Sequence, residues 1–228
     1  MQIDILYRPS HSMGVLKLAG GESVRVEAGS MLSLTPGIQI ETKAAGGILK
    51  SLGRSLLGGE SFFQNTYTAP AAGGEINVAP VLPGDLHPVT LSGEALLIQS
   101  GSFVACESGV ELSTKWGGAK SFFSSEGFIM LQGSGTGQML LSSYGAMHEM
   151  DLLPEQGLTV DTGHLVAFSE RIGFKVRPIS GVKSTLFSGE GLVVDLTGPG
   201  KVLLQTRSAS ALLSWLIPKI PTQRGSSS

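Results

Sequence analysis

Short stretches in which apolar and polar residues alternate recur along the chain. Four of them are Val24–Glu27, Ile38–Glu41, Val110–Ser113 and Phe174–Arg177. Alternation with a period of two places one face of a β-strand in a core and the other face toward water. The pattern therefore predicts half-buried strands at these positions.

Other stretches are apolar without alternation, namely Ala95–Ile98, Phe128–Leu131 and Val202–Leu204. Such runs suit strands that are covered on both faces. Gly, Pro, Ser and Asp punctuate the chain at short intervals, and helical periodicity is scarce. Together these features predict an all-β fold of antiparallel sandwich or barrel-like units.

The sequence contains three copies of one repeated unit. Gly29, Gly101 and Gly163 each follow an apolar-polar-small triplet, and the similarity continues downstream into a strand-like segment and a later glycine turn. The spacings between these glycines, 72 and 62 residues, are too long for one coil of a solenoid, so each copy is expected to be a small β subdomain. The repetition predicts three units in a pseudo-threefold arrangement.

The domain organisation follows from the copies. Residues 1–207 are expected to form a single β domain, with units of about 1–86, 87–147 and 148–207. Residues 208–228 are expected to form a short apolar helix and a disordered tail that starts after Pro221.

Residues 46–59 interrupt the first copy where the others have a short connection. Paired glycines bound this insertion, and Lys50 and Arg54 stack on one side of a helix built from it. Its apolar side comprises Ile48, Leu49, Leu52 and Leu56. The segment is expected to cap the open end of a unit, to contact another protomer or to dock on a membrane surface.

The second departure from the β pattern is the tail. Its apolar residues are Leu212, Leu213, Trp215 and Leu216, and Pro218 ends the helix they predict. Docking onto the β body or a neighbouring subunit is favoured over lipid insertion, because the helix is short and only Lys219 and Arg224 follow it.

Composition narrows the function further. Charged residues make up 15% of the chain and the net charge is −2, so no basic stripe is available for a nucleic acid. A sparsely charged, apolar surface instead favours contact with other subunits. The single Cys106 has no internal disulfide partner and lies among apolar residues, which predicts an inert thiol. Neither a signal peptide nor a membrane span is evident, so a cytoplasmic location is expected.

The search for chemistry finds no established constellation. His87 and His148 precede matching apolar segments and are interpreted as turn residues, as is His11; His164 replaces a serine of the other copies and is a weaker candidate to line a cleft. The matching Glu126 and Glu190 are assigned to the fold, although two acids could contribute to a cation site. Phosphate loops, nucleophile elbows and metal-ligand spacings are absent from the sequence, so no cofactor is expected.

The opening strand, Glu27–Met31, the glycine-bounded insertion and Gly59–Phe63 with Asn65 resemble the bacterial branch of the altered-inheritance-of-mitochondria 24 family. The resemblance extends to about Arg207. It implies an all-β fold similar to the tryptophan RNA-binding attenuation protein, in repeated form and often oligomeric. It implies little chemistry, because bacterial members have no established activity and mitochondrial relatives look like inner-membrane organisation factors. No mitochondrial presequence is recognisable, so the organelle role is not expected to carry over directly.

The sequence thus favours a non-enzymatic, homo-oligomeric scaffold or a membrane-peripheral organising protein. The alternative is a module that binds a small ligand or metal ion in clefts between the repeats. A hydrolase or oxygenase has no supporting residues.

Overall fold

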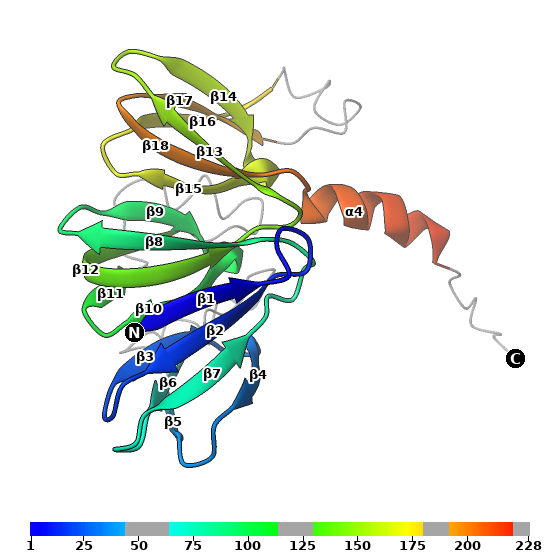
Figure 1. The fold of residues 1–228 in the computed structure, drawn as a ribbon. Coiled ribbons are helices and arrows are strands. Elements are labelled where there is room, and N and C mark those ends of the chain that lie inside the picture. The colour runs from blue at the N-terminus through cyan, green and yellow to red at the C-terminus, as the bar shows by residue number, and fades with distance from the viewer. Residues whose placement is uncertain (44–63, 114–129, 180–191, 221–228) are drawn as a thin grey trace, which may run out of the picture.

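The computed structural model describes residues 1–43, 64–113, 130–179 and 192–220. It is predominantly β, as expected, and the sheets are stacked one above another with the helix α4 (Ala209–Leu216) projecting to one side (Figure 1). The N-terminal strands lie at one end of the stack and the last strands at the other (Figure 1).

The sheet at the N-terminal end has four strands in the order β1-β2-β7-β4. Their bounds are β1 (Gln2–Leu6), β2 (Met13–Leu18), β4 (Met31–Leu34) and β7 (Gly74–Val78). All neighbouring strands are antiparallel, and β7 lies between β2 and β4. β4 pairs with β7 alone among the strands that the structure describes.

Eleven further strands are joined by hydrogen bonds into one continuous network. They are β3 (Ser23–Glu27), β5 (Gln39–Lys43), β6 (Gln64–Thr68), β8 (Leu86–Ser92), β9 (Leu96–Gln99), β10 (Phe103–Glu107), β11 (Val110–Ser113), β12 (Met130–Ser142), β13 (Met147–Leu152), β15 (Leu165–Ser169) and β18 (Gly200–Gln205). The short helices η1 (Ser100–Ser102) and η2 (Thr162–His164) precede β10 and β15.

The long strand β12 belongs to both halves of this network. Its first half pairs with β9 and β11, and its second half pairs with β8 and β10. One half of the network therefore runs β8-β12-β10-β3-β6-β5, and the other runs β13-β18-β15-β9-β12-β11. The last sheet has three strands in the order β14-β17-β16, formed by β14 (Gly157–Asp161), β17 (Leu192–Thr197) and β16 (Gly173–Pro178).

Three apolar cores separate these sheets. The first is built around Leu16, Val24 and Leu140, the second around Phe103, Met139 and Leu203, and the third around Phe168, Val194 and Val202. Neighbouring residues of β12 face different cores: Leu140 belongs to the first, whereas Met139 and Leu141 belong to the second. This alternation is what a strand covered on both faces requires.

Most predicted elements are confirmed. The alternating stretches form β3, β5, β11 and β16, and the apolar runs contribute to β9, β12 and β18. Ile40 differs, because the alternation assigned it to a core and its side chain is 48% exposed. The reason is that β5 is the last strand of its sheet and pairs with β6 alone among the described strands. The pseudo-threefold arrangement remains a prediction.

The interpretation of two histidines as turn residues is wrong. His87 lies within β8 and His148 within β13, where they pair with Leu141 and Leu204. Each lies inside a strand with a paired residue opposite it, so neither belongs to a turn. The equivalence of the two positions remains a prediction.

Candidate functional site: a groove beside strand β8

A groove of about 460 Å³ opens where β8 and β9 meet β15 and β18. It is lined by Gly93, Glu94, Ala95, Ser169, Glu170, Arg171, Pro199 and Gly200. The tight turn between β8 and β9 places Gly93 and Glu94 on one side, and the turn after β15 places Glu170 and Arg171 on the other. Residues distant in the sequence are held together here because β15 pairs with β9, with Ser169 opposite Leu96.

The groove continues along β8. A second part of about 340 Å³ shares Glu94, Ala95 and Ser169 with the first and follows the strand from His87 to Leu91, with Lys201 opposite. Each part falls within the size range of small-ligand pockets, which is about 300–1,000 Å³. The combined site is therefore an elongated trough rather than a closed cavity.

Charged groups converge on the β8 end of this trough. Glu149 of β13 forms an ion pair with Lys201, and its other carboxylate oxygen lies 3.2 Å from the Nε2 atom of His87. The hydrogen bond to Glu149 raises the pKa of Lys201. Burial lowers the pKa of His87, so its imidazole is neutral at neutral pH. Glu149 thereby balances the Lys201 charge and leaves this end close to neutral.

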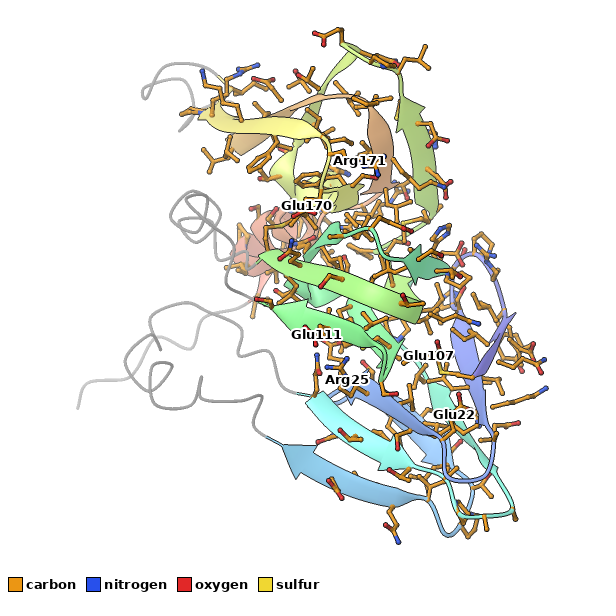
Figure 2. The ribbon with its side chains drawn as sticks, turned by 90° about the vertical axis from the view of Figure 1, so that its left-hand side faces the viewer. Glu22, Arg25, Glu107, Glu111, Glu170 and Arg171 are labelled. Atoms are coloured by element: carbon orange, nitrogen blue, oxygen red, sulfur yellow. The ribbon has the colours of Figure 1, made fainter. Side chains whose placement is uncertain are left out.

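The other end is more acidic. Glu170 accepts a hydrogen bond of 2.7 Å from the amide of Gln132, while the exposed Glu94 and Arg171 line the groove without any ion pair between them in the described residues. Figure 2 shows Glu170 and Arg171 next to each other, above Glu22 and Glu107. Carboxylates and a guanidinium can bind a polar ligand, but the lining residues include no activated nucleophile.

A second cluster of charge lies between the N-terminal sheet and the next. The ammonium group of Met1 donates hydrogen bonds to Glu22 and, at 2.9 Å, to Glu107. Hydrogen bonding to Glu22 raises the pKa of this ammonium group and lowers the pKa of Glu22. The other carboxylate oxygens accept backbone N–H bonds from Ala19 and Gln138, of 2.9 and 2.7 Å. An ammonium group is thus bound by two oriented carboxylates.

The predicted apolar helix is present as α4 (Ala209–Leu216), followed by η3 (Ile217–Lys219). Ser208 caps its N-terminus by accepting a hydrogen bond from the Ala211 N–H. None of its residues is buried: Leu213 and Trp215 are 50% and 59% exposed, and Leu212 is half-buried. The ammonium of Lys219 lies 4.9 Å from the centre of the Trp215 ring. Figure 1 shows the helix extending away from the sheets.

Several predicted candidates lie outside the described residues. These are the apolar positions of the insertion, Ile48, Leu49, Leu52 and Leu56, and the two acids Glu126 and Glu190. Cys106 lies in β10 and is buried, and burial raises the pKa of its thiol to about 11, which supports the prediction of an inert thiol. The His164 Nδ1 atom is 2.7 Å from the Gln205 carbonyl oxygen. The ring is thereby fixed against β18.

The sequence reasoning overlooked Glu22, Glu94 and Glu170. A signal for the first two was present, since Glu22 and Glu94 each stand seven residues before an aligned glycine. Nothing comparable marked Glu170, which reaches the groove only because β15 pairs with β9. Within the described ranges no His, Cys, Asp and Glu side chains gather into a group that could hold a metal ion. No described helix is both long and apolar enough to cross a membrane.

Comparison with known proteins gives a family and little chemistry. Residues 3–207 match the family described as mitochondrial biogenesis AIM24. An uncharacterised protein of Streptococcus pyogenes serotype M6 is 26% identical over 217 residues, which is 91% of this chain and 86% of that one. A crystal structure of another Streptococcus pyogenes protein aligns with a TM-score of 0.80 at 23% identity, covering 96% of this chain and 99% of that chain. At that identity the likeness concerns the fold.

Proposed function

We propose that this chain, which belongs to the mitochondrial biogenesis AIM24 family, is an oligomeric scaffold whose copies join edge to edge through β4 and β14. The observation that carries the proposal is an exposed apolar pair on β4. Met31 and Leu32 are 38% and 58% exposed, although strands further along the chain bury the residues at the matching positions.

The matching positions come from the aligned glycines. Two and three residues after Gly101 stand Phe103 and Val104, and after Gly163 stand Leu165 and Val166. All four are buried, with exposures of 2% or less. Large apolar side chains on an open strand edge invite pairing with another strand, and native proteins usually protect such edges. The β4 edge is therefore best explained as one that becomes covered.

Two junctions within the chain supply the template for this pairing. β10 pairs with β3 so that Ala105 lies opposite Val26. β15 pairs with β9 in the same way, with Ala167 opposite Ile98. The strands β3, β9 and β14 stand just before the aligned glycines Gly29, Gly101 and Gly163. If β4 pairs as β10 and β15 do, its partner is therefore β14. β14 pairs with β17 alone among the described strands, so its second edge is open as well.

The template fixes the register between copies. Ser33 of one copy is expected opposite Val160 of the next, and Leu34 opposite Thr159. This contact would join the four-stranded sheet of one copy to the three-stranded sheet of its neighbour, as the β10–β3 and β15–β9 pairings join strands within each half of the central network. Because the two edges differ, the contact is head-to-tail and produces a closed ring or an open filament. The pseudo-threefold relation of the units belongs to the same proposal.

Light scattering coupled to size-exclusion chromatography tests the assembly. We expect the unaltered chain to be oligomeric and Leu32→Asp to be monomeric, because a carboxylate cannot be buried unpaired in the new sheet. Tyr7→Asp is the matched control, since Tyr7 is 71% exposed and follows β1, the strand at the opposite edge of this sheet from β4. A monomeric unaltered chain, or equal assembly of Leu32→Asp and the control, would overturn the proposal.

A disulfide tests the register. Residues opposite each other in antiparallel strands have Cα atoms about 4.5–5.5 Å apart, which a disulfide can bridge. The double variant Leu34→Cys/Thr159→Cys should therefore form covalent oligomers on oxidation. Leu34→Cys/Leu153→Cys, with the second cysteine in the exposed turn before β14, should not. Cross-linking of the control pair alone would contradict the register.

We further infer that α4 attaches the assembly to a membrane surface. Its exposed Leu213, Trp215 and Leu216 form an apolar contact, and an aromatic ring beside a lysine is typical of the lipid headgroup region. A single short helix binds weakly, but several copies in one oligomer would bind together far more strongly.

Co-sedimentation with anionic phospholipid vesicles tests this attachment. We expect the unaltered chain to pellet with the vesicles and Trp215→Ser/Leu216→Ser to remain in the supernatant. Ala211→Ser changes an exposed residue of the same helix and should pellet normally. If the unaltered chain stays in solution, the membrane role is wrong and the assembly proposal is unaffected.

A further inference from the structure

The first strand of the chain, β1, shows how an extended segment can bind to a sheet edge in this fold. β1 lies antiparallel along the edge of β2, with Gln2 opposite Lys17. At its start, the Met1 ammonium group is held by Glu22 and Glu107, and the Met1 carbonyl oxygen lies 3.4 Å from the amide nitrogen of Gln138. A strand edge and a charged end site thus cooperate to bind one extended segment.

Strand β8 occupies the place in its sheet that β2 occupies in the first one. β2 pairs with β7, which also pairs with β4. In the same way β8 pairs with β12, which also pairs with β10. In the first sheet the outer edge of β2 is covered by β1. The outer edge of β8 is covered by no strand in the described part of the chain, and the groove runs along it.

The end site has a counterpart as well. Glu94 precedes Gly101 by the same seven residues that separate Glu22 from Gly29. Ser169 stands where Glu107 stands, because its hydroxyl accepts a 3.0 Å hydrogen bond from the Lys201 N–H just as Glu107 accepts one from the Gln138 N–H. The neighbouring Glu170 lines the same end of the groove and supplies a second carboxylate.

We propose that this groove binds an extended peptide segment that begins with a free amino group. The segment adds as a strand to the open edge of β8, with its ammonium group between Glu94 and Glu170. By analogy with β1, its second residue lies opposite Thr90 and its first reaches the β8–β9 turn. Strand addition of this kind is a common mode of peptide recognition.

Charge favours an amino terminus over other ligands. The two carboxylates attract an ammonium group, and Arg171 beside them can donate to the carbonyl oxygen of the first residue. The Lys201 ammonium does not oppose the ligand, because its partner is Glu149. A segment with a blocked amino group would leave both carboxylates without the cation, and it would lose most of the end-site interaction.

Pro88 limits which strands can pair with the open edge of β8. Proline in a sheet is tolerated at an edge where its missing N–H faces away from the neighbouring strand. At the centre of β8 it therefore removes one donor from the open edge, which weakens pairing with any strand. The ammonium site restores the lost affinity for segments that carry a free amino end, and this combination gives selectivity.

The probe for the test is a synthetic peptide of this chain's own residues 1–7, with a fluorophore attached through an amide at its C-terminus. Fluorescence anisotropy is measured against the full chain with the amino group free or acetylated. We expect the acetylated peptide to bind at least about tenfold more weakly, a difference of about 1.4 kcal/mol. Binding should also weaken above pH 9, because the peptide amino group loses its proton near pH 8.

Three variants locate the site. Glu94→Gln/Glu170→Gln should reduce binding of the free peptide to the level of the acetylated one. Glu155→Gln alters an exposed carboxylate outside the groove and should bind normally. Equal binding of the two peptides, or an unaffected Glu94→Gln/Glu170→Gln variant, would overturn the proposal. So would loss of binding in Glu22→Gln alone, because the peptide would then be displacing β1.

The groove lies within one chain, so the peptide site does not depend on assembly. Leu32→Asp should therefore bind the peptide with the same affinity as the unaltered chain. Loss of peptide binding together with assembly would mean that the site is formed between copies, which contradicts this proposal and leaves the scaffold proposal intact.

Discussion

At the scale of single residues, the contact between Met1, Glu22 and Glu107 shows how a few charges fix the relation between two sheets. Glu22 precedes β3 and Glu107 ends β10, so the ammonium group between them connects two units of the chain. Each carboxylate is also oriented by a hydrogen bond from a backbone N–H group. Preorganised partners reduce the conformational entropy lost in forming the contact.

We predict that this contact makes stability pH-dependent at both extremes. The pKa of the Met1 ammonium is raised, so its contribution is complete below about pH 8 and is lost as the pH rises through the folded-state value. The pKa of Glu22 is lowered, so its contribution is present above its ordinary value, about 4.3, and disappears as the pH falls through the folded-state value. Urea unfolding should show Glu22→Gln less stable than the unaltered chain at pH 7. At pH 10.5 that difference should be much smaller. A constant difference across this range would assign the effect of Glu22 to something other than the ammonium group.

A second prediction concerns Cys106. Its side chain is fully buried in β10 and the pKa of its thiol is about 11, because burial disfavours the thiolate. An aromatic disulfide reagent should leave the native protein unmodified at pH 8 and should react with one thiol per chain in guanidinium chloride. Rapid reaction under native conditions would show that this region of β10 opens locally. The same protection keeps Cys106 out of the engineered disulfides described above.

At the scale of elements, β12 is the strand that joins two sheets. It spans Met130–Ser142 and changes partners near its middle, where Gly135 and Gly137 have φ values of +100° and +145°. A side chain at Gly135 would place its Cβ atom 2.4 Å from the Gly109 carbonyl oxygen. Glycine is therefore required at this bend by both backbone conformation and space.

We predict that Gly135→Ala lowers the free energy of unfolding by about 2 kcal/mol or more, through strain and the backbone clash. Gly173→Ala is the control, because a Cβ atom there would meet its nearest neighbours at 3.8 Å, an ordinary contact. Chemical denaturation of both variants provides the comparison. If the two lose equal stability, the bend in β12 does not depend on this glycine.

The elements themselves were largely readable from the sequence. Alternation in β3 and β11 and the apolar run of β18 follow directly from which faces are covered. The helix α4 was predicted from its leucines and Trp215, which precede Pro218. His87 and His148 were misassigned to turns because each was interpreted only as preceding an apolar segment; the long-range pairing that places them within strands is not visible in the sequence.

At the scale of the whole molecule, the stack of sheets ends in two different edges. β4 exposes Met31 and Leu32, and β14 offers the strand that the internal junctions would place beside it. The peptide groove lies at an internal junction instead, between the turns that follow β8 and β15. The proposed assembly and the proposed peptide site thus use different surfaces.

We predict that thermal stability depends on protein concentration, because association stabilises the folded state by mass action. A hundredfold increase in concentration should raise the Tm of the unaltered chain by several degrees, whereas Leu32→Asp should show no such increase. Calorimetry at matched scan rates checks this. A concentration-independent Tm for both proteins would argue against assembly through β4.

The sequence alone predicted the all-β class, most strands, the apolar helix and the position of Cys106 in a strand. These properties depend on local periodicity and on neighbouring residues, which one chain displays directly. Only the tertiary structure decided which strands pair, because pairing joins residues such as Ser169 and Leu96 that lie far apart in the sequence. Pairing brought Glu94 and Glu170 to one groove and left β4 and β14 at open edges. The candidate functional surfaces therefore follow from long-range contacts that no local pattern encodes.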